Sequence, residues 1–394
     1  MKIAIIGAGF TGLAAAFELS KHKHSVTIFE KESQPGGLAI GFKDEKWQWN
    51  LDKHYHHLFT SDHSIINLAK EVGHKINFYR PKTSTLINDK IYQLDSPTSL
   101  LKFPELPLVD RLRTAAGLAS LKFNPLWQPL EYFTAEKYIK MTMGEKSWKI
   151  LWEPLMVGKF GEYSHQVSAA WFWARIFKRS TSLGYPEGGF QELANSVASA
   201  ITSRGGKIIY NKTIDKISDL TSEFDKVICT LPTQTFAKIS GLEYEESLGL
   251  GAVNLVVALK KPFLKDGTYW LNINDRKLPY LAIVEHTNFI DKKYYGEDHL
   301  LYIGNYLPAT HKYFSLNAKE LLDIYMPGLE NVRRAWVWKA PFAQPIVTTN
   351  YSSKIPPLTT KMPNVYLANM QQVYPWDRGT NYAVELGIDV AKNI

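Results

Sequence analysis

The sequence contains almost no cysteine. Its 394 residues include one, Cys229, within the apolar run KVICTLP. A single cysteine can form neither an internal disulfide nor a cysteine-based metal centre, so both are excluded. The apolar neighbours of Cys229 predict an inert core residue.

Long apolar runs are also missing. No stretch approaches the ~18 apolar residues that a membrane-spanning helix needs. The first apolar run, IAII, leads directly into a glycine turn and does not have the pattern of a signal peptide. Together with the low cysteine content, this predicts a cytoplasmic protein.

Charges of one sign do not form blocks. The chain has 46 Lys and Arg against 38 Asp and Glu, a net charge of +8, but the excess is dispersed along the sequence. A dispersed basic surface excludes a nucleic-acid-binding tail, and we expect no nucleic-acid partner. Such a surface is compatible with peripheral contact to the anionic inner face of a membrane.

Glycine, in contrast, is concentrated at the start. The chain begins MKIAIIGAGFTG, which places Gly7, Gly9 and Gly12 in a GxGxxG pattern between a predicted strand (2–6) and an alanine-rich helix (11–20). The first glycine permits a tight turn, the second lets the backbone approach a pyrophosphate, and the third lets the helix pack against the sheet. The helix N-terminus would then bind the phosphates.

An acidic residue ends the next predicted strand, 25–30. Glu30 lies 23 residues after Gly7, where a carboxylate accepts hydrogen bonds from ribose hydroxyls and repels the 2′-phosphate of NADP. The alternative is a helix-packing turn with an unrelated acid. The order of strand, turn, helix, strand and acid favours a dinucleotide site.

A second glycine turn, SQPGGL, follows, and a simple dehydrogenase does not need it. The order GxGxxG, Glu, GG resembles the flavoprotein superfamily of amine oxidases, protoporphyrinogen oxidases and carotenoid desaturases, with the bacterial protoporphyrinogen-oxidase-like branch as the nearest likeness. The resemblance implies FAD as the cofactor. The FAD contacts that it implies in this part of the chain are Gly7, Ala8, Gly9, Phe10, Thr11, Gly12, Glu30, Lys31, Gly36, Gly37 and Leu38.

The resemblance extends to the end of the chain. YPEGGFQELANSVASAITSRGG resembles the P-x-GG-x-x-x-L helix of these families, TIDKIS their adenine-side strand, KVICTLPT their D-x-V-I-x-x-x-P segment, and NVYLANM with the final helix their C-terminal flavin motif. Asn369 and Tyr382 depart from the usual residues. Thr380 or Asn381 can also act as an ordinary helix cap. The further implied FAD contacts are Ile214, Pro232, Asn369, Gly379, Thr380, Asn381 and Tyr382.

These motifs imply a fold class and a domain arrangement. We expect an α/β protein with a Rossmann-type FAD-binding domain of the GR2-like flavoprotein fold and an inserted mixed α+β substrate domain. The FAD-binding domain is predicted to be discontinuous, comprising residues 1–70, 185–240 and 346–394. The substrate domain is predicted to comprise residues 71–184, mostly helical, and 241–345, mostly strand-like.

Three histidines stand together in LDKHYHHLF. Histidine commonly binds transition metals. However, on a strand His54 and His56 share a face while His57 points away, and no acid completes a facial triad, so we expect no metal. In the resembling families this segment passes the flavin ring as D/E-x-G-P, with glycine where Lys53 stands. The resemblance makes Lys53, His54, Tyr55 and His56 candidate catalytic residues. The alternative is hydrogen bonding beneath the flavin.

Other side chains have both a structural and a functional interpretation. Arg378 would pair with a phosphate or with Asp377. Arg175 and Arg179 share a predicted helix face and would meet an anionic substrate or solvent. The remaining candidates of this kind are Tyr374, Trp376, Glu285 and His286.

The expected function is that of an FAD-dependent oxidoreductase. A small apolar, aromatic or sugar-linked substrate would give a hydride to flavin N5, and oxygen or a quinone would reoxidise the flavin. One alternative is an enzyme similar to UDP-galactopyranose mutase, which has no net redox change and needs arginines for a diphosphate. Another is a flavin-binding protein without turnover. The arginines available to a mutase are Arg80, Arg175, Arg179 and Arg276.

Overall fold

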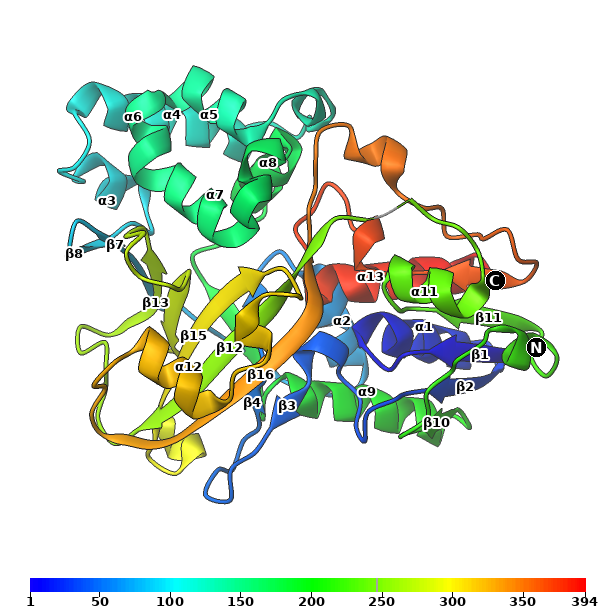
Figure 1. The fold of residues 1–394 in the computed structure, drawn as a ribbon. Coiled ribbons are helices and arrows are strands. Elements are labelled where there is room, and N and C mark those ends of the chain that lie inside the picture. Colours follow the sequence, from blue (N-terminus) through cyan, green and yellow to red (C-terminus); the bar gives the residue numbers. More distant parts are fainter. Residues whose placement is uncertain (246) are drawn as a thin grey trace.

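The chain is built around two sheets. The computed structural model describes residues 1–245 and 247–394, and within them a five-stranded and a seven-stranded sheet are the largest. Figure 1 shows the smaller sheet near both termini and the larger sheet beneath a group of helices. The strands of the smaller sheet all come from the three segments predicted to bind FAD, and those of the larger sheet from the two segments predicted to bind substrate.

Every pairing in the smaller sheet is parallel within the described residues. The strand order is β10 (Lys207–Ile209), β2 (Ser25–Phe29), β1 (Lys2–Ile6), β11 (Lys226–Cys229) and β17 (Val365–Leu367). The central strand β1 is a run of buried Ile and Ala because helices cover both faces of the sheet. Cys229 is buried in this core, as predicted.

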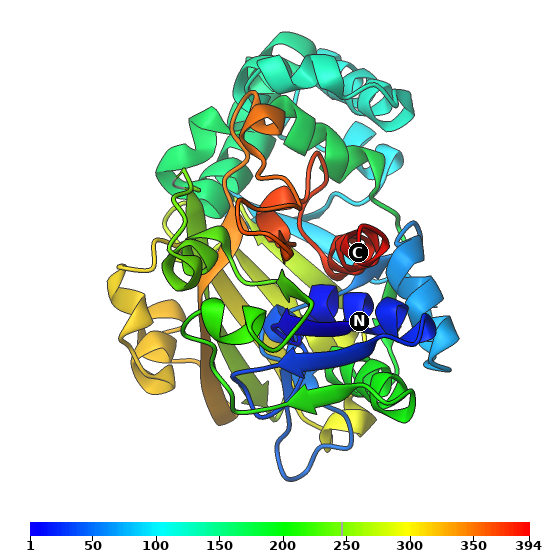
Figure 2. The same ribbon diagram turned by 90° about the vertical axis from the view of Figure 1, so that its right-hand side faces the viewer.

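One face of this sheet carries three helices and the other face carries two shorter ones. The first group is α1 (Phe10–Lys21), α9 (Phe190–Ser203) and α13 (Thr380–Lys392), and the second is α10 (Ser218–Thr221) and α11 (Thr233–Ser240). α1 and α13 approach closely, since a Cβ on Gly387 would lie 2.3 Å from the carbonyl oxygen of Thr11. Figure 2 looks nearly along α13 and shows both termini on the same side of the molecule.

The larger sheet confirms the predicted strand-rich region. Its order is β16 (Val332–Pro345), β12 (Gly249–Leu259), β15 (His299–Leu307), β14 (Ala282–Glu285), β13 (Thr268–Ile273), β7 (Lys82–Ile87) and β8 (Lys90–Gln93). Its pairings are antiparallel except for β13 with β7. Helix α12 (Ala318–Tyr325) packs on the outer face of this sheet.

A helical layer covers one end of the larger sheet (Figure 1). It comprises α3 (Pro97–Leu101), α4 (Leu108–Phe123), α5 (Ala135–Met143), α6 (Glu145–Ser147), a π-helical turn (Trp148–Trp152), α7 (Glu153–Phe160) and α8 (Ala169–Phe177). Its core includes the buried side chains of Trp148, Trp171 and Trp173. In the described part of the chain, no helix is both long and apolar enough to span a bilayer.

Short strands join the two sheets. β3 (Gly41–Phe42) pairs with β4 (Leu51–Asp52), while β5 (Leu58–Phe59) and β6 (Ile76–Tyr79) both pair with β9 (Leu183–Pro186). Helix α2 (His63–Glu71) follows β5.

Neither residues 53–57 nor the segment TIDKIS forms a strand, and for TIDKIS the predicted strand was wrong. Residues 53–57 bend between β4 and β5, because the ring of His56 bonds the carbonyl oxygen of His54 at 2.6 Å and takes an acceptor that a strand partner would use. The segment TIDKIS is also not a strand. It runs past the end of β2, where Lys212 donates to the carbonyl oxygen of Glu30 at 2.8 Å and no further strand residue remains beside it.

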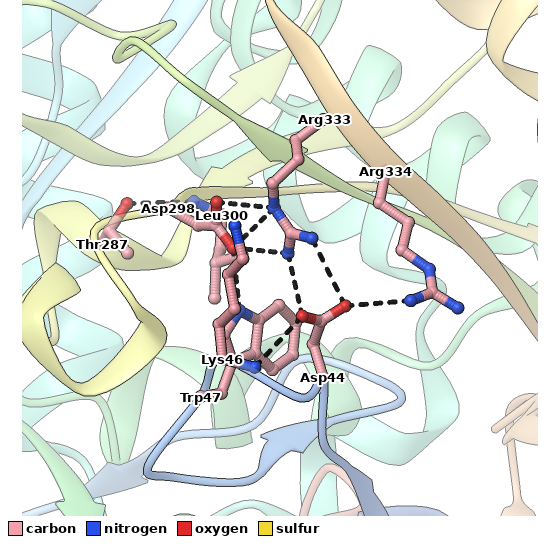
Figure 3. Close-up of polar contacts among 8 residues, drawn as sticks. All are labelled: Asp44, Lys46, Trp47, Thr287, Asp298, Leu300, Arg333 and Arg334. Atoms are coloured by element: carbon pink, nitrogen blue, oxygen red, sulfur yellow. Dashed lines mark hydrogen bonds and ion pairs between the residues drawn. The ribbon is translucent and has the colours of Figure 1, made fainter.

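An ion-pair cluster fixes the loop between β3 and β4 against the larger sheet. Figure 3 shows Arg333 between Asp298, at 2.8 Å from its Nε, and Asp44, at 3.3 Å from its Nη2. Arg334 lies 3.2 Å from Asp44, and the Trp47 indole donates to Asp298 at 2.9 Å. Both carboxylates are buried, so the loop that leads into residues 53–57 is held by charge-assisted hydrogen bonds.

Candidate functional site

Two glycines of the first motif are required by internal packing. Gly7 has a φ of +102°, and a Cβ there would lie 2.5 Å from Thr230 Oγ1. A Cβ on Gly12 would lie 2.0 Å from the carbonyl oxygen of Gly7. Both residues therefore shape the turn from β1 into α1, with or without a ligand.

Gly9 is different. Its φ of −70° and ψ of 172° suit any residue, and the nearest atom to an added Cβ would be Gly37 Cα at 3.7 Å. Gly9 is also the N-cap of α1 and gives that helix no side-chain cap. Its missing side chain leaves room at a helix N-terminus, which suits a phosphate group.

The second glycine turn lies directly beside the first. Gly36 donates its N–H to the carbonyl oxygen of Ala8 at 2.9 Å and forms a parallel bridge with Gly9. Gly36 and Gly37 have φ values of +133° and +59°, and a Cβ on Gly37 would lie 2.9 Å from Gly9 Cα. The two turns approach with no side chain between them. Next to them, Leu38 packs toward the larger sheet.

Glu30 directly follows β2 and lies under the first turn. Its Oε2 accepts the N–H of Ala8 at 2.6 Å and its Oε1 accepts the N–H of Glu32 at 2.9 Å. Each carboxylate oxygen keeps a second acceptor position, so the geometry suits both turn stabilisation and ribose binding. Lys31 is largely exposed and lies 3.6 Å from Glu32. Phe10 and Thr11 are buried in the first turn of α1.

The N-terminus of α13 also lacks a side-chain cap. Gly379 is its N-cap, and a Cβ there would meet only Tyr382, at 3.9 Å. The prediction that Thr380 or Asn381 caps α13 was wrong, because Asn381 Oδ1 accepts the N–H groups of Ser64 and Ile65 and so caps α2. The first N–H groups of α13 are thereby left for a ligand.

The remaining implied FAD contacts are engaged within the protein. Asn369 is buried and donates to Leu231 and Thr233, tying the end of β17 to the end of β11. Pro232 is the N-cap of α11, and Ile214 packs in the core beneath the parallel sheet. Tyr382 stacks on Trp376 with an interplanar angle of 6°.

The polar segment 53–57 lies between the larger sheet and helix α9, where the His56 ring is 5.4 Å from the Phe190 ring. His54 Nδ1 is 2.7 Å from the Asn254 amide, and the Tyr55 ring meets Trp270 edge-on at 4.9 Å. The Lys53 ammonium lies 4.5 Å from the Trp338 ring centre. The structure brings these side chains together with residues of β12, β13 and β16. Asn254, for example, is 200 positions away from His54 in sequence.

Burial keeps these histidines neutral. Desolvation lowers the pKa of His54 to about 3, of His56 to about 4 and of His57 to about 3. Neutral imidazoles could bind a metal. However, the described residues contain no group of three or more His, Cys, Asp or Glu placed to hold one.

A buried carboxyl group lies behind this segment. Burial raises the pKa of Asp52 to about 8, although Tyr185 donates to it at 2.9 Å. Tyr302 donates to the carbonyl oxygen of Asp52 at 2.6 Å. The resemblance had placed Asp52 at the acid of the D/E-x-G-P segment beside the flavin ring, but no pattern in the sequence indicated that its carboxyl group is buried.

A cation cluster adjoins the N-terminus of α13. Asp377 accepts from Lys159 at 3.0 Å and from Arg175 at 2.6 Å, and Arg378 donates to Gln344 at 3.0 Å. Neither interpretation of Arg378 predicted this pairing. Lys159 was missed entirely, because an isolated lysine on a helix carries no sequence signal.

The other candidate side chains form hydrogen bonds within the protein, and these contacts have a structural role. Glu285 accepts the N–H of Phe263 at 3.2 Å, and His286 meets the Tyr295 hydroxyl at 2.9 Å. Tyr374 donates to Glu131 at 2.9 Å. Arg179 lies beyond both the last residue of α8, Phe177, and its C-cap, Lys178, so it does not share a helix face with Arg175.

Comparison with known proteins gives distant relatives over much of the chain. An uncharacterized protein of Methanocaldococcus jannaschii is 25% identical over 84% of this chain and 82% of its own length. Coproporphyrinogen III oxidase of Staphylococcus aureus is 23% identical over 59% of this chain and 61% of its own. Zeta-carotene desaturase of Solanum lycopersicum is 30% identical over 30% of this chain and 22% of its own.

Solved structures share the fold. Reduced UDP-galactopyranose mutase superposes with a TM-score of 0.78 at 16% identity, covering 100% of this chain and 95% of that one. Putrescine oxidase bound to putrescine gives 0.69 at 15%, covering 100% and 99%. These likenesses confirm the predicted fold class. The family model for flavin-containing amine oxidoreductases matches residues 10–394, so the chain belongs to that family, and its cofactor is FAD.

Proposed function

We propose that the protein is an oxidoreductase that removes a hydride from a carbon of a small organic substrate. The observation that carries this proposal is the bridge between Gly9 and Gly36 beside the uncapped start of α1, in a chain that matches the family over almost its whole length. When bound, FAD supplies the two-electron acceptor, with oxygen or a quinone as the final oxidant.

The two glycine turns hold the cofactor in this proposal. The N–H groups of Ala8 and Gly36 are already donated within the protein, so the N–H groups at the start of α1 would face the pyrophosphate, and Glu30 would accept from the ribose hydroxyls. The uncapped N-terminus of α13, at Gly379, places partial positive charge at the other end of the site. Negative charge gained by the ring system on reduction would be stabilised there.

The histidines give the ring end a proton donor and a proton acceptor. His54 Nδ1 accepts from the Asn254 amide, so Nε2 carries its proton. His56 Nδ1 donates to the carbonyl oxygen of His54, so its Nε2 is the bare acceptor. The aromatic rings of Trp270 and Tyr302 pack against Tyr55 and exclude water from this side of the ring end.

Anaerobic mixing with candidate substrates tests the proposal. We expect an amine, a porphyrinogen, a polyene or a sugar-linked lipid to bleach the flavin absorbance, and air to restore it. A substrate that is converted without bleaching, and only after reduction with dithionite, would contradict an oxidoreductase.

A mutase-like activity without net redox change is the second candidate. It is favoured by the shared fold with UDP-galactopyranose mutase and by the cations near α13. Of the arginines expected to serve a mutase, Arg175 belongs to these cations and pairs with Asp377, whereas Arg276 pairs with Glu153 at 3.3 Å. Conversion of a UDP-sugar by the reduced enzyme alone would establish this candidate. A protein inactive in both assays would be a non-catalytic flavoprotein.

We also propose peripheral contact with an anionic membrane surface. On α4 and its C-terminal end, Val109 is 74% and Phe123 82% exposed, and Leu108 and Leu112 extend the same apolar face. Exposed Arg113 flanks it, and basic residues favour anionic lipid. Sedimentation with phosphatidylserine vesicles should remove the wild-type protein from solution. Val109→Ser/Phe123→Ser should remain soluble, and equal sedimentation of both would refute the contact.

A further inference from the structure

Two cations share one carboxylate oxygen in the loop before α13. Asp377 Oδ2 accepts from Lys159 Nζ at 3.0 Å and from Arg175 Nη1 at 2.6 Å, while Asp377 Oδ1 accepts from the Trp171 indole at 2.9 Å. Lys159 belongs to α7 and Arg175 to α8. Two helices of the inserted layer thus meet the loop that leads into the FAD-binding helix.

The next residue, Arg378, adds a third cation without adding an anion. It donates to Gln344 Oε1 at 3.0 Å and to the Tyr306 hydroxyl, and its guanidinium lies 5.1 Å from the Tyr306 ring centre. Among the described residues it has no ion pair within 4.0 Å. The cluster therefore places three basic side chains around the single carboxylate of Asp377.

An excess of positive charge is costly in a site with little solvent. Lys159 keeps only 13% of its side chain exposed, and Asp377 keeps 21%. Burial, and then the nearby Arg175 and Arg378, lower the pKa of Lys159 to about 7 in spite of Asp377. In a purely structural cluster, the positive and negative charges would be equal in number. An unbalanced, partly buried cluster is stabilised by an additional anion.

The cluster is also placed where a substrate of the proposed reaction must lie. Arg378 directly precedes Gly379, the N-cap of α13. Tyr306, its partner, and Leu38 of the second glycine turn both pack against the cluster of Ala252, Ala340 and Ala343. The cations therefore adjoin the N-terminus of α13, which is proposed to hold the ring end of the cofactor, and lie on the side of the second glycine turn.

We infer that Lys159, Arg175 and Arg378 form a subsite for an anionic group of the substrate, either a carboxylate or a phosphate. The two guanidinium groups offer paired donors that match either anion, and the ammonium adds a compact charge. This inference rests on the proposed function and names the substrate class for it. Binding the anion here would orient the reacting carbon toward the cofactor.

Direct titration of the FAD-loaded protein tests the subsite. Its FAD content is first measured by absorbance. Pyrophosphate and succinate are then titrated separately at constant ionic strength, followed by calorimetry and by the flavin spectrum. We expect saturable binding of at least one probe. Binding of pyrophosphate alone would assign a phosphate, and binding of succinate alone a carboxylate.

Variants separate a subsite from general attraction of anions. Lys159→Met should weaken binding at least tenfold. Arg175→Met should do the same, and the half-exposed surroundings of Arg175 tolerate this change. Lys319→Met, which removes an exposed lysine of α12 paired with Asp323, should leave it unchanged. Asp377→Asn removes the competing carboxylate and should tighten binding at least threefold, a gain that a purely structural ion pair would not give.

Two different failures are distinguishable. No saturable binding to fully FAD-loaded protein, or equal binding by wild type, Lys159→Met and Arg175→Met, would overturn the subsite alone. A protein that takes up no FAD would overturn the proposed function, and this inference with it.

Discussion

The two ends of the proposed cofactor site are formed by different parts of the chain, by backbone at one end and by side chains at the other. At the pyrophosphate end, Gly9 and Gly36–Gly37 bring backbone to backbone within one stretch of about thirty residues. At the ring end, side chains from well-separated segments converge, including His54 with Asn254 and Lys159 with Asp377, which is 218 residues further along.

This difference follows from what each end must recognise. Phosphates are bound by N–H groups and a helix dipole, which every sequence can supply if glycine leaves the space open. A ring and its substrate are recognised by side-chain shape, charge and proton position, which vary with chemistry. We therefore expect changes at the first end to alter FAD affinity and changes at the second to alter reactivity.

The largest effect is expected at Gly9. Gly9→Val places a side chain where the phosphate would lie, and overpacking of about 3 kcal/mol would weaken FAD binding on the order of a hundredfold. The apo-protein should lose no more than about 1 kcal/mol, the cost of a poorer cap residue. Equilibrium dialysis and urea unfolding measure the two quantities.

Gly12→Ala is the matched control for that variant. Its Cβ would lie 2.0 Å from the Gly7 carbonyl oxygen, so stability should fall in the apo-protein as well. If Gly9→Val kept full flavin occupancy, the pyrophosphate assignment would be wrong.

The next effect tests how the ring end is supported. Arg333→Met would leave Asp44 and Asp298 as buried carboxylates, at a cost of about 3–5 kcal/mol in the free energy of unfolding. Arg334→Met removes a neighbouring, mostly exposed cation and should cost ~1 kcal/mol or less. Equal losses in urea unfolding would show that the cluster in Figure 3 does not hold the loop through Arg333.

A smaller effect concerns a buried histidine behind the ring end. Burial lowers the pKa of His286 to about 3 from an ordinary value of 6.5. Its contribution to stability is therefore fully present above pH ~6.5 and is lost as the pH falls toward 3, because only the unfolded state takes up the proton. Between pH 6.5 and 5.0, wild type should lose about 1.5 kcal/mol more than His286→Gln. If the free energy of unfolding changed equally with pH in the two proteins, His286 would be in contact with solvent.

The smallest effect is on the flavin potential. A positive charge on Lys53 near the ring would stabilise the reduced, anionic cofactor, so Lys53→Met should lower the two-electron potential by ~20 mV, or about 1 kcal/mol after screening. FAD affinity should be unchanged. Lys319→Met on α12 serves as the charge-matched control. An identical shift of the flavin potential in both variants would show that Lys53 does not lie near the ring.

The same contrast explains what the sequence could predict. The turns, β1, α1, β2 and the final helix were predictable because local spacing and glycine chemistry determine them. Sequence could not reveal the pairing of Lys159 with Asp377, since neither residue stands in a pattern. The bend at residues 53–57 was not predictable because a side chain of the same segment bonds the backbone. The cap that Asn381 gives to α2 was not predictable either, because the two lie more than 300 positions apart in sequence.

A crystal structure of the FAD-bound protein would show where the two ends of the cofactor lie. We expect the pyrophosphate beside Gly9 and Gly36, and at least one side chain of Lys53, His54, Tyr55 or His56 within hydrogen-bonding or stacking distance of the isoalloxazine ring. A ring more than ~8 Å from all four side chains, beyond a bridging water, would contradict the division into a pyrophosphate end and a ring end.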